Sequence, residues 1–283
     1  MDWFYWLQVF ALGLVEGLTE LLPISSTGHL IVTANLVDFT KRAGAGMFMV
    51  TIQAGSILAV CWYYRQRILQ VLTGLWHRDP IQTRLAVNVI VAFLPAAIIG
   101  VMIASAIKQH LFNPITVAIA LIVGGVIILA VENYHRKNQI QARITSMEEM
   151  TWKDALLVGF AQCLAMIPGT SRSGATIIGS LLLGFSRKTA AEFSFFLSIP
   201  TILGATVYEF WNARNQAFVD FLPGMIFGMV VSFFAALLVV HWLLRYISNH
   251  SFKAFGWYRI FFGIVIFMTA WLGIVSWEGV ESF

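Results

Sequence analysis

The sequence of 283 residues contains few charged residues and only two cysteines. Lys, Arg, Asp and Glu together make up 11% of the chain, whereas soluble domains carry about 25%. Hydrophobic residues make up 59%, and the mean hydropathy is +0.79. An ordinary soluble domain is therefore excluded. The repeated apolar blocks are close to the length of a membrane span, which predicts a helical membrane protein rather than a barrel of short alternating strands.

The cysteines and the first residues carry no sign of metal binding or secretion. Cys61 and Cys163 lie in apolar segments without metal-ligand spacing, so they are interpreted as small core residues. The start of the chain has Asp2 and no early Lys or Arg, so the first apolar stretch is expected to belong to the mature protein. The net charge of +4 is attributed to cytoplasmic loops, and no nucleic-acid partner is expected.

Six apolar stretches are long enough to cross a bilayer as helices. They are residues 46–64, 85–107, 114–132, 189–210, 221–246 and 255–277. Two further apolar stretches, 3–37 and 155–185, are interrupted by polar residues and proline, so each is predicted to form a re-entrant helical hairpin. The predicted fold class is an all-α integral membrane protein with six spanning helices and two re-entrant helical hairpins.

Weak matches between the two halves of the chain occur in the same order. Residues 13–18 match 159–164, 27–28 match 173–174, 53–59 match 198–204, and 94–95 match 222–223. One membrane domain is therefore expected, with repeat one at about 1–132, a polar linker at about 133–154 and repeat two at about 155–283. Three spans per repeat give the repeats opposite orientations, and inverted repeats place sites near the membrane midplane.

The charges of the loops predict the orientation of the protein. One face is expected to carry only Lys41, Arg42, Lys108 and Arg214. The opposite face is expected to carry Arg65, Arg67, Arg78, Arg84, Arg136, Lys137, Arg143, Lys153, Arg187, Lys188, Arg245 and Lys253. This more basic face is predicted to be cytoplasmic, with both termini outside and the two hairpin tips meeting within the membrane.

Two carboxylates lie in the first interrupted stretch, residues 16–29 (EGLTELLPISSTGH). Glu16 and Glu20 are four residues apart, which places them on one helix face about 6 Å from each other. Buried carboxylates this close repel unless a cation lies between them, and Mg²⁺ or Ca²⁺ suits oxygen ligands. Alternatively, one carboxylate acts as a base or orients His29, or the pair lines an ion or proton path.

Each interrupted stretch also contains a loop typical of anion binding. Ser25, Ser26 and Thr27 follow a proline at a predicted helix start, where exposed N–H groups and the helix dipole attract anions. Residues 168–176 (PGTSRSGAT) have the same character, and Arg172 can hold phosphate oxygens through two donors. Helix capping is the alternative explanation for the serines, but it does not explain an arginine at membrane depth. The combination favours phosphoryl transfer over ion conduction.

Both motifs resemble the two signatures of the undecaprenyl-pyrophosphate phosphatases, the BacA-type bacitracin-resistance proteins. The resemblance extends over nearly the whole chain, through residues 112–114 and 191–195. It implies an enzyme of the bacterial cytoplasmic (inner) membrane, with its active site facing the periplasm or exterior. Such an enzyme removes the terminal phosphate of an isoprenyl diphosphate lipid, which recycles the carrier for peptidoglycan synthesis and opposes bacitracin. Membrane lipid and a second copy of the chain, forming a homodimer, are the other partners considered.

The resemblance also implies roles for individual residues. Ser26 corresponds to the proposed nucleophile and His29 to the essential imidazole, while direct attack by His29 or by a metal-activated water remains open. Glu16 and Glu20 correspond to the family's pair of acidic residues, which is implicated in binding a metal and in catalysis. The residues expected to be catalytic or to bind the diphosphate are Glu20, Ser25, Ser26, Thr27, His29, Ser171, Arg172, Ser173 and Thr176. The alternative function is that of an inverted-repeat lipid flippase or transporter.

Overall fold

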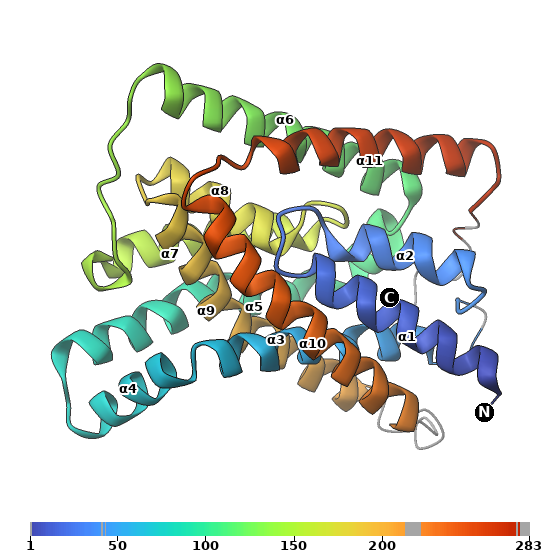
Figure 1. The fold of residues 1–283 in the computed structure, drawn as a ribbon, viewed down its shortest axis with the longest axis horizontal. Coiled ribbons are helices and arrows are strands. Elements are labelled where there is room, and N and C mark those ends of the chain that lie inside the picture. Colours follow the sequence, from blue (N-terminus) through green and yellow to red (C-terminus); the bar gives the residue numbers. More distant parts are fainter. Residues whose placement is uncertain (1, 41, 43, 213–221, 276, 278–283) are drawn as a thin grey trace.

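The computed structural model describes residues 2–40, 42, 44–212, 222–275 and 277 (Figure 1). Lys41 and Arg214, which entered the orientation argument, lie outside these residues. The described chain forms the α-helices α1 (Trp3–Thr19), α2 (Ser26–Leu36), α3 (Ala45–Tyr63), α4 (Arg65–Trp76), α5 (Pro80–Leu111), α6 (Pro114–Lys137), α7 (Trp152–Cys163), α8 (Arg172–Leu182), α9 (Arg187–Asn212), α10 (Leu222–Ile247) and α11 (Lys253–Trp271). Short 3₁₀ helices, η1 (Met147–Glu149) and η2 (Leu164–Met166), precede and follow α7.

Six of these helices, α3, α5, α6, α9, α10 and α11, are long and apolar enough to cross a membrane. They correspond to the six predicted spans, and the prediction of an all-α membrane protein is confirmed. Helix α5 begins earlier than the predicted residue 85, because Asp79 caps its first turn and Pro80 occupies its first position. Helix α4 was expected to be loop. Ile68 and Val71 pack against the core, but its 12 residues are too few for a membrane span, and apolar stretches of spanning length were the signal that identified the other long helices.

The two interrupted stretches form helical hairpins that approach each other from opposite ends of the molecule (Figure 1). Helices α1 and α2 form the first hairpin, and α7 and α8 form the second. Their tips contain Ser25 and Ser171, which have positive φ angles of 71° and 72°. A non-glycine residue in this region is strained and persists only where its surroundings fix it, which is typical of functional sites. The depth of the hairpins in a bilayer stays a prediction.

Each hairpin packs against a long helix of the other half of the chain. Helix α1 packs on α10, and α7 packs on α5, while α3 lies against both α9 and α10. Glycines allow these backbones to approach closely: a Cβ atom on Gly17 would lie 2.4 Å from Ser232 O, and one on Gly159 would lie 2.5 Å from Ala92 O. The matching arrangement of α1 and α7 agrees with the duplication, which remains a prediction.

The close approach at Gly17 predicts a loss of stability on substitution. Gly17→Ala is expected to lower the free energy of unfolding by about 1–3 kcal/mol, because the added methyl group overpacks the α1–α10 contact. Gly100→Ala is the matched control, since its Cβ would meet only the end of Met166, at 4.0 Å. Thermal unfolding of both variants in detergent measures the difference. Equal melting temperatures would show that α1 and α10 can move apart without cost.

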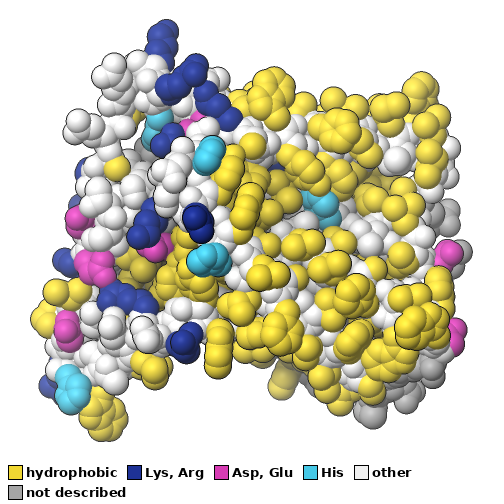
Figure 2. Space-filling model, in the orientation of Figure 1, with side chains coloured by type: hydrophobic (Ala, Val, Ile, Leu, Met, Phe, Trp, Pro, Cys, Tyr) yellow, Lys and Arg dark blue, Asp and Glu magenta, His cyan; other side chains and the backbone are white. Residues whose placement is uncertain are grey.

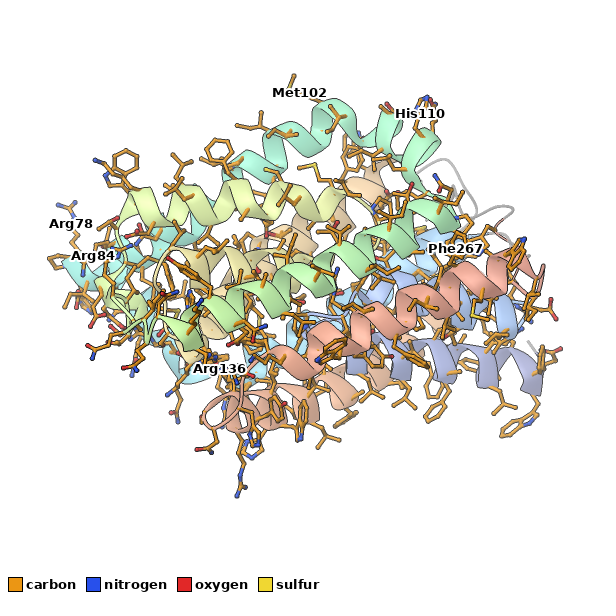
Figure 3. The ribbon with its side chains drawn as sticks, turned by 90° about the horizontal axis from the view of Figure 1, so that it is seen from above. Arg78, Arg84, Met102, His110, Arg136 and Phe267 are labelled. Atoms are coloured by element: carbon orange, nitrogen blue, oxygen red, sulfur yellow. The ribbon has the colours of Figure 1, made fainter. Side chains whose placement is uncertain are left out.

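Charged side chains on the face shown in Figure 2 gather mainly at one end, and hydrophobic side chains cover most of the remaining surface. Figure 3 places Arg78, Arg84 and Arg136 toward this end and His110 toward the other. An ion pair of 2.7 Å from Arg143 to Asp154 ties the linker to the start of α7. Burial alone would raise the pKa of Asp154, but bonds from Arg143 and Thr151 outweigh it and hold the pKa below its ordinary value.

Candidate active site

The two hairpin tips are joined by side-chain contacts between the predicted motifs. Ser173 Oγ donates hydrogen bonds to the carbonyl oxygens of Leu22, at 2.7 Å, and Glu20, at 3.3 Å. Arg172 Nη2 donates to Glu20 Oε1 at 2.9 Å. The structure therefore brings the acidic motif of the first hairpin and the arginine motif of the second into one site.

Glu20 lies between a cation and a hydroxyl. Its Oε1 atom accepts from Arg172, and its Oε2 atom accepts a hydrogen bond of 2.5 Å from Ser26 Oγ. Both Glu20 and Ser26 are 8% exposed. Because a buried carboxylate within hydrogen-bond reach of a hydroxyl can take its proton, this geometry allows Glu20 to activate Ser26 as a nucleophile.

Arg172 is held from the side opposite Glu20 by α9. Its Nη1 atom donates to Ser194 O at 3.1 Å, and the hydroxyl of Ser194 is bonded to that of Thr176 at 2.7 Å. The Nε–H group of Arg172 is buried and has no hydrogen-bond partner within the described ranges. A buried donor without a partner is costly, so Nε remains available for an anionic ligand.

Glu16 lies one helical turn before Glu20 and is completely buried, with 0% of its surface exposed. Its two carboxylate oxygens have no hydrogen-bond partner among the described residues. A hard cation would satisfy the same oxygens, so the donor chemistry fits Mg²⁺ or Ca²⁺. No cluster of three His, Cys, Asp or Glu side chains suited to a metal occurs in the described part of the chain.

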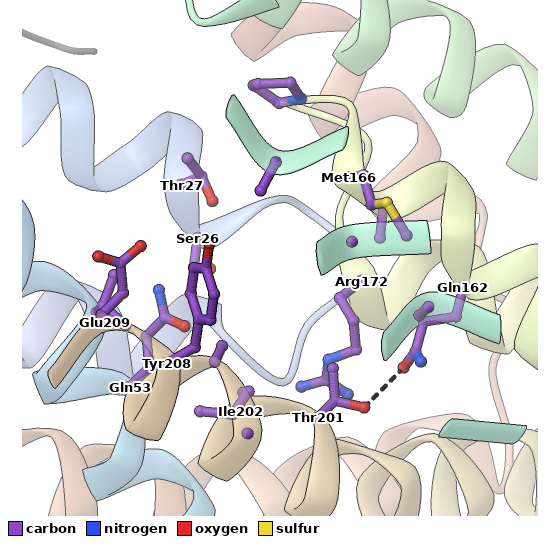
Figure 4. Close-up of a pocket in the computed structure, with 18 of the residues that line it drawn as sticks. Ser26, Thr27, Gln53, Gln162, Met166, Arg172, Thr201, Ile202, Tyr208 and Glu209 are labelled. Atoms are coloured by element: carbon purple, nitrogen blue, oxygen red, sulfur yellow. Dashed lines mark hydrogen bonds between the residues drawn. The ribbon is translucent and has the colours of Figure 1, made fainter. Parts of the chain in front are cut away.

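A cavity of 720 Å³ begins at this polar cluster. Glu20, Ser26 and Arg172 form part of its wall, and Thr201 donates a hydrogen bond of 3.2 Å to Gln162 beside them (Figure 4). The walls formed by α5 and α9 are mainly apolar and contain small residues, among them Ala96, Ala97, Gly100, Gly204 and Ala205. The cavity thus combines a polar pocket at the hairpin tips with an apolar passage between two long helices.

The residues predicted to be catalytic or to bind the diphosphate separate into three groups in the structure, whereas Glu16, predicted to bind a metal, is buried and does not line the cavity. Glu20, Ser25, Ser26, Thr27, Ser171 and Arg172 line the cavity. Ser173 and Thr176 are buried beside the cavity. Ser173 donates a hydrogen bond to Leu22 O in the first tip, and Thr176 donates one to Arg172 O. His29 is absent from the cavity-lining residues, because it faces α11 on another side of α2.

Both ring nitrogens of His29 already have hydrogen-bond partners. Nδ1 is bonded to Ser25 O at 2.8 Å, and Nε2 is bonded to the Tyr258 hydroxyl at 2.6 Å. The ring also stacks on Phe262 with a centroid distance of 4.0 Å. In this conformation His29 bonds the strained backbone of Ser25 and does not line the cavity.

Several residues of the site are not among those predicted from the sequence. Gln53, Gln162, Tyr208 and Glu209 line the cavity near the predicted motifs, and Figure 4 shows them around Ser26 and Arg172. Ser194 supports Arg172 from α9. Polar residues within otherwise apolar spans were the available signal for Gln53 and Ser194.

Comparison with known proteins identifies the family of the chain. The family model described as "Bacitracin resistance protein BacA" matches residues 9–265. The chain belongs to this family. An undecaprenyl-diphosphatase of Cupriavidus metallidurans is 51% identical over 288 residues, covering 96% of this chain and 98% of that protein. Undecaprenyl-diphosphatase 2 of Rhodospirillum rubrum is 52% identical over 278 residues, covering 98% of this chain and 100% of that protein. The BacA relatives therefore match nearly the full length of the chain.

Proposed function

We propose that the protein hydrolyses undecaprenyl diphosphate to undecaprenyl phosphate and inorganic phosphate. The observation that carries the proposal is the joining of Glu20, Ser26 and Arg172 at the polar end of an apolar cavity. A lipid diphosphate combines an anionic head with an apolar chain, and the cavity has a matching division. The names of the BacA relatives support the choice of lipid. The transporter alternative has no support from the comparisons.

The proposed reaction passes through a phosphorylated serine. Ser26 Oγ attacks the terminal phosphorus while its proton passes to Glu20, and the bond from this phosphorus to the bridging oxygen breaks. Glu20 returns the proton to the departing undecaprenyl phosphate and then takes one from the water that attacks the phosphoserine. As the bond from phosphorus to Ser26 Oγ breaks and inorganic phosphate leaves, Glu20 passes this proton to Ser26 Oγ, which restores the starting state. Arg172 stabilises the negative charge that spreads over the phosphoryl oxygens in both steps. Attack by water or by His29 remains the alternative.

A divalent cation at Glu16 and Glu20 is part of the proposal. When bound, Mg²⁺ or Ca²⁺ would offset charge on the two carboxylates and on the diphosphate. Chelation with EDTA is expected to lower phosphate release at least tenfold, and added cation to restore it. Glu16→Gln should weaken the dependence on cation concentration, measured as the half-saturating concentration. Full activity in EDTA, with no metal found in the purified protein, would remove the cation from the mechanism.

The orientation proposed for the protein has both termini and the active site facing the periplasmic or exterior side. The gathering of Arg78, Arg84 and Arg136 at the opposite end supports this orientation under the positive-inside rule. Hydrolysis on the outer side would return the carrier lipid to peptidoglycan synthesis and reduce the amount of lipid diphosphate that bacitracin can bind.

The test of the function is phosphate release by the purified protein in detergent. Undecaprenyl diphosphate should yield inorganic phosphate, and a soluble control without a prenyl chain, inorganic pyrophosphate, should be hydrolysed far more slowly. Undecaprenyl diphosphate that stays intact while an undecaprenyl-diphosphatase of known activity consumes it in parallel would refute the proposal.

The contact between His29 and Tyr258 gives a separate prediction. If His29 acts by supporting Ser25, Tyr258→Phe removes one of its two hydrogen bonds and should lower turnover about fivefold, the equivalent of about 1 kcal/mol. Tyr134→Phe is the control, because Tyr134 is 59% exposed near the end of α6. Unchanged or faster turnover in Tyr258→Phe would instead favour a mechanism in which the His29 ring breaks its contact with α11 and turns into the cavity to react.

A further inference from the structure

Arg259 in α11 is a buried cation outside the predicted motifs. Only 1% of its surface is exposed. Arg172 and Arg259 are the two basic residues that the loop-charge prediction assigned to neither face. A buried arginine within a membrane protein is expensive, so its bonding partners indicate what it does.

All the recorded hydrogen bonds of Arg259 go to backbone carbonyl oxygens. In α6, Nη2 donates to Ala120 O at 3.0 Å and Nε to Leu121 O at 3.3 Å. In the second hairpin tip, Nη2 donates to Gly169 O at 3.0 Å and Nη1 to Thr170 O at 2.8 Å.

The fifth bond reaches the other hairpin. Nη1 donates to Pro23 O, in the first tip, at 3.2 Å. A guanidinium carries five N–H donors in one plane, and these five bonds use its full capacity. Arg259 therefore connects both tips to each other and to α6.

The neighbours of Arg259 leave room for its side chain. A Cβ atom on Gly124 would lie 2.2 Å from Arg259 Nη2, and one on Gly174 would lie 3.1 Å from Nη1. Glycine at position 124 is therefore required for the guanidinium to bond the tips as it does. The pocket for Arg259 is built from α6, α8 and the two hairpin tips, and it shares Gly169 with the wall of the cavity.

The carbonyl partners of Arg259 lie close in sequence to the residues of the proposed reaction. Thr170 is followed directly by the strained Ser171 and by Arg172, and Pro23 lies three residues before Ser26. Holding the Thr170 carbonyl toward Arg259 also points the N–H of Ser171 away from it, because the peptide unit is planar and trans.

We propose that Arg259 is a positioning residue, which holds the two hairpin tips in the register that places Arg172 and Ser26 on either side of Glu20. The expected effect of Arg259 on turnover rests on the proposed function, whereas its expected effect on the position of the tips rests on the structure alone. Arg259 touches no reacting atom in this role and acts through the backbone of both tips.

The kinetic test compares Arg259→Met and Arg259→Lys with the wild type on undecaprenyl diphosphate. Because a displacement of about 1 Å at a reacting group can cost 10²-fold, kcat is expected to fall about 100-fold, with a much smaller change in KM. Lysine should not rescue kcat, since its three donors on one atom cannot span five carbonyls. Arg245→Met, at an exposed position in the last turn of α10, is the control and should match the wild type.

The geometric test is hydrogen exchange measured by mass spectrometry, which needs no activity. Arg259→Met should speed exchange in peptides covering residues 20–26 and 167–174, while α10 exchanges at the wild-type rate. Gly124→Ala provides a second variant that keeps the charge but displaces the guanidinium. It should show the same fall in kcat and the same faster exchange at both tips. If Arg259→Met fails to fold, Gly124→Ala decides the question.

The two proposals can fail separately. A wild type that releases no phosphate refutes the function, yet faster exchange at both tips would still support the positioning role. Wild-type kcat in Arg259→Met, or slow exchange at the tips in both variants, would overturn the role of Arg259 even if the wild type is an active phosphatase.

Discussion

Replacing Arg172 by lysine is expected to lower phosphate release by about 10³-fold or more, which is the range that a transition-state arginine contributes to phosphoryl transfer. Arg172 presents Nη1 to Ser194 O and Nη2 to Glu20 while Nε stays available. Lysine has one charged atom and cannot satisfy three directions at once. The effect should fall mainly on kcat, because the charge on the phosphoryl oxygens increases in the transition state.

A matched control for Arg172→Lys is Arg143→Lys. Arg143 pairs with Asp154 at the base of the same hairpin, and its side chain is 56% exposed. It should keep nearly full turnover and an unchanged melting temperature. Activity within tenfold of the wild type in a folded Arg172→Lys protein would mean that the diphosphate is bound elsewhere.

The second large effect is expected for Glu20→Gln. Glutamine keeps the shape of the side chain but cannot take a proton from Ser26, so turnover should fall about 10²–10⁴-fold. The change also leaves Arg172 buried without its counter-charge, which should lower the free energy of unfolding by about 3–5 kcal/mol. Phosphate release and thermal unfolding in detergent measure the two effects separately.

A double variant separates the chemistry from the stability. Glu20→Gln combined with Arg172→Gln removes both charges, so much of the lost stability should return while turnover stays absent. If the double variant were as unstable as Glu20→Gln, the ion pair would not be the cause. Ser26→Ala completes the set: rapid-quench trapping of a phosphoserine in the wild type supports attack by Ser26, whereas substantial turnover in Ser26→Ala would favour attack by water.

Much of this site could be predicted from residues whose presence in an apolar chain has a high energetic cost. Glu20 and Arg172 are ionisable residues in interrupted apolar stretches, and the structure joins them at the hairpin tips. The place of Ser26 in an anion-binding loop followed from its position at a helix start, whereas its role as nucleophile came from the resemblance to the phosphatase family. The positions of the two charged residues needed only the local sequence and the cost of charge at membrane depth.

The remaining features of the site could not be predicted, because they depend on which way each helix faces in the packed structure. His29 lies two residues after Thr27, about 200° around α2, so the two side chains face different sides of the helix. Thr27 lines the cavity, whereas His29 meets Tyr258. Arg259 was overlooked because one arginine hardly changes the hydropathy of α11, and its carbonyl partners come from segments far away in the sequence. Such contacts appear only once the helices are packed.

The packing of each hairpin on the opposite half of the chain has a consequence for synthesis of the protein. Helix α1 leaves the ribosome long before α10, against which it packs, and Arg259 on α11 is made later still. A nascent chain halted after α9 would therefore contain Glu20, Ser26 and Arg172 but lack both the support for α1 and the bonds that join the tips. Catalytic competence would arise only with insertion of the last helix, so incomplete chains in the membrane would be inert.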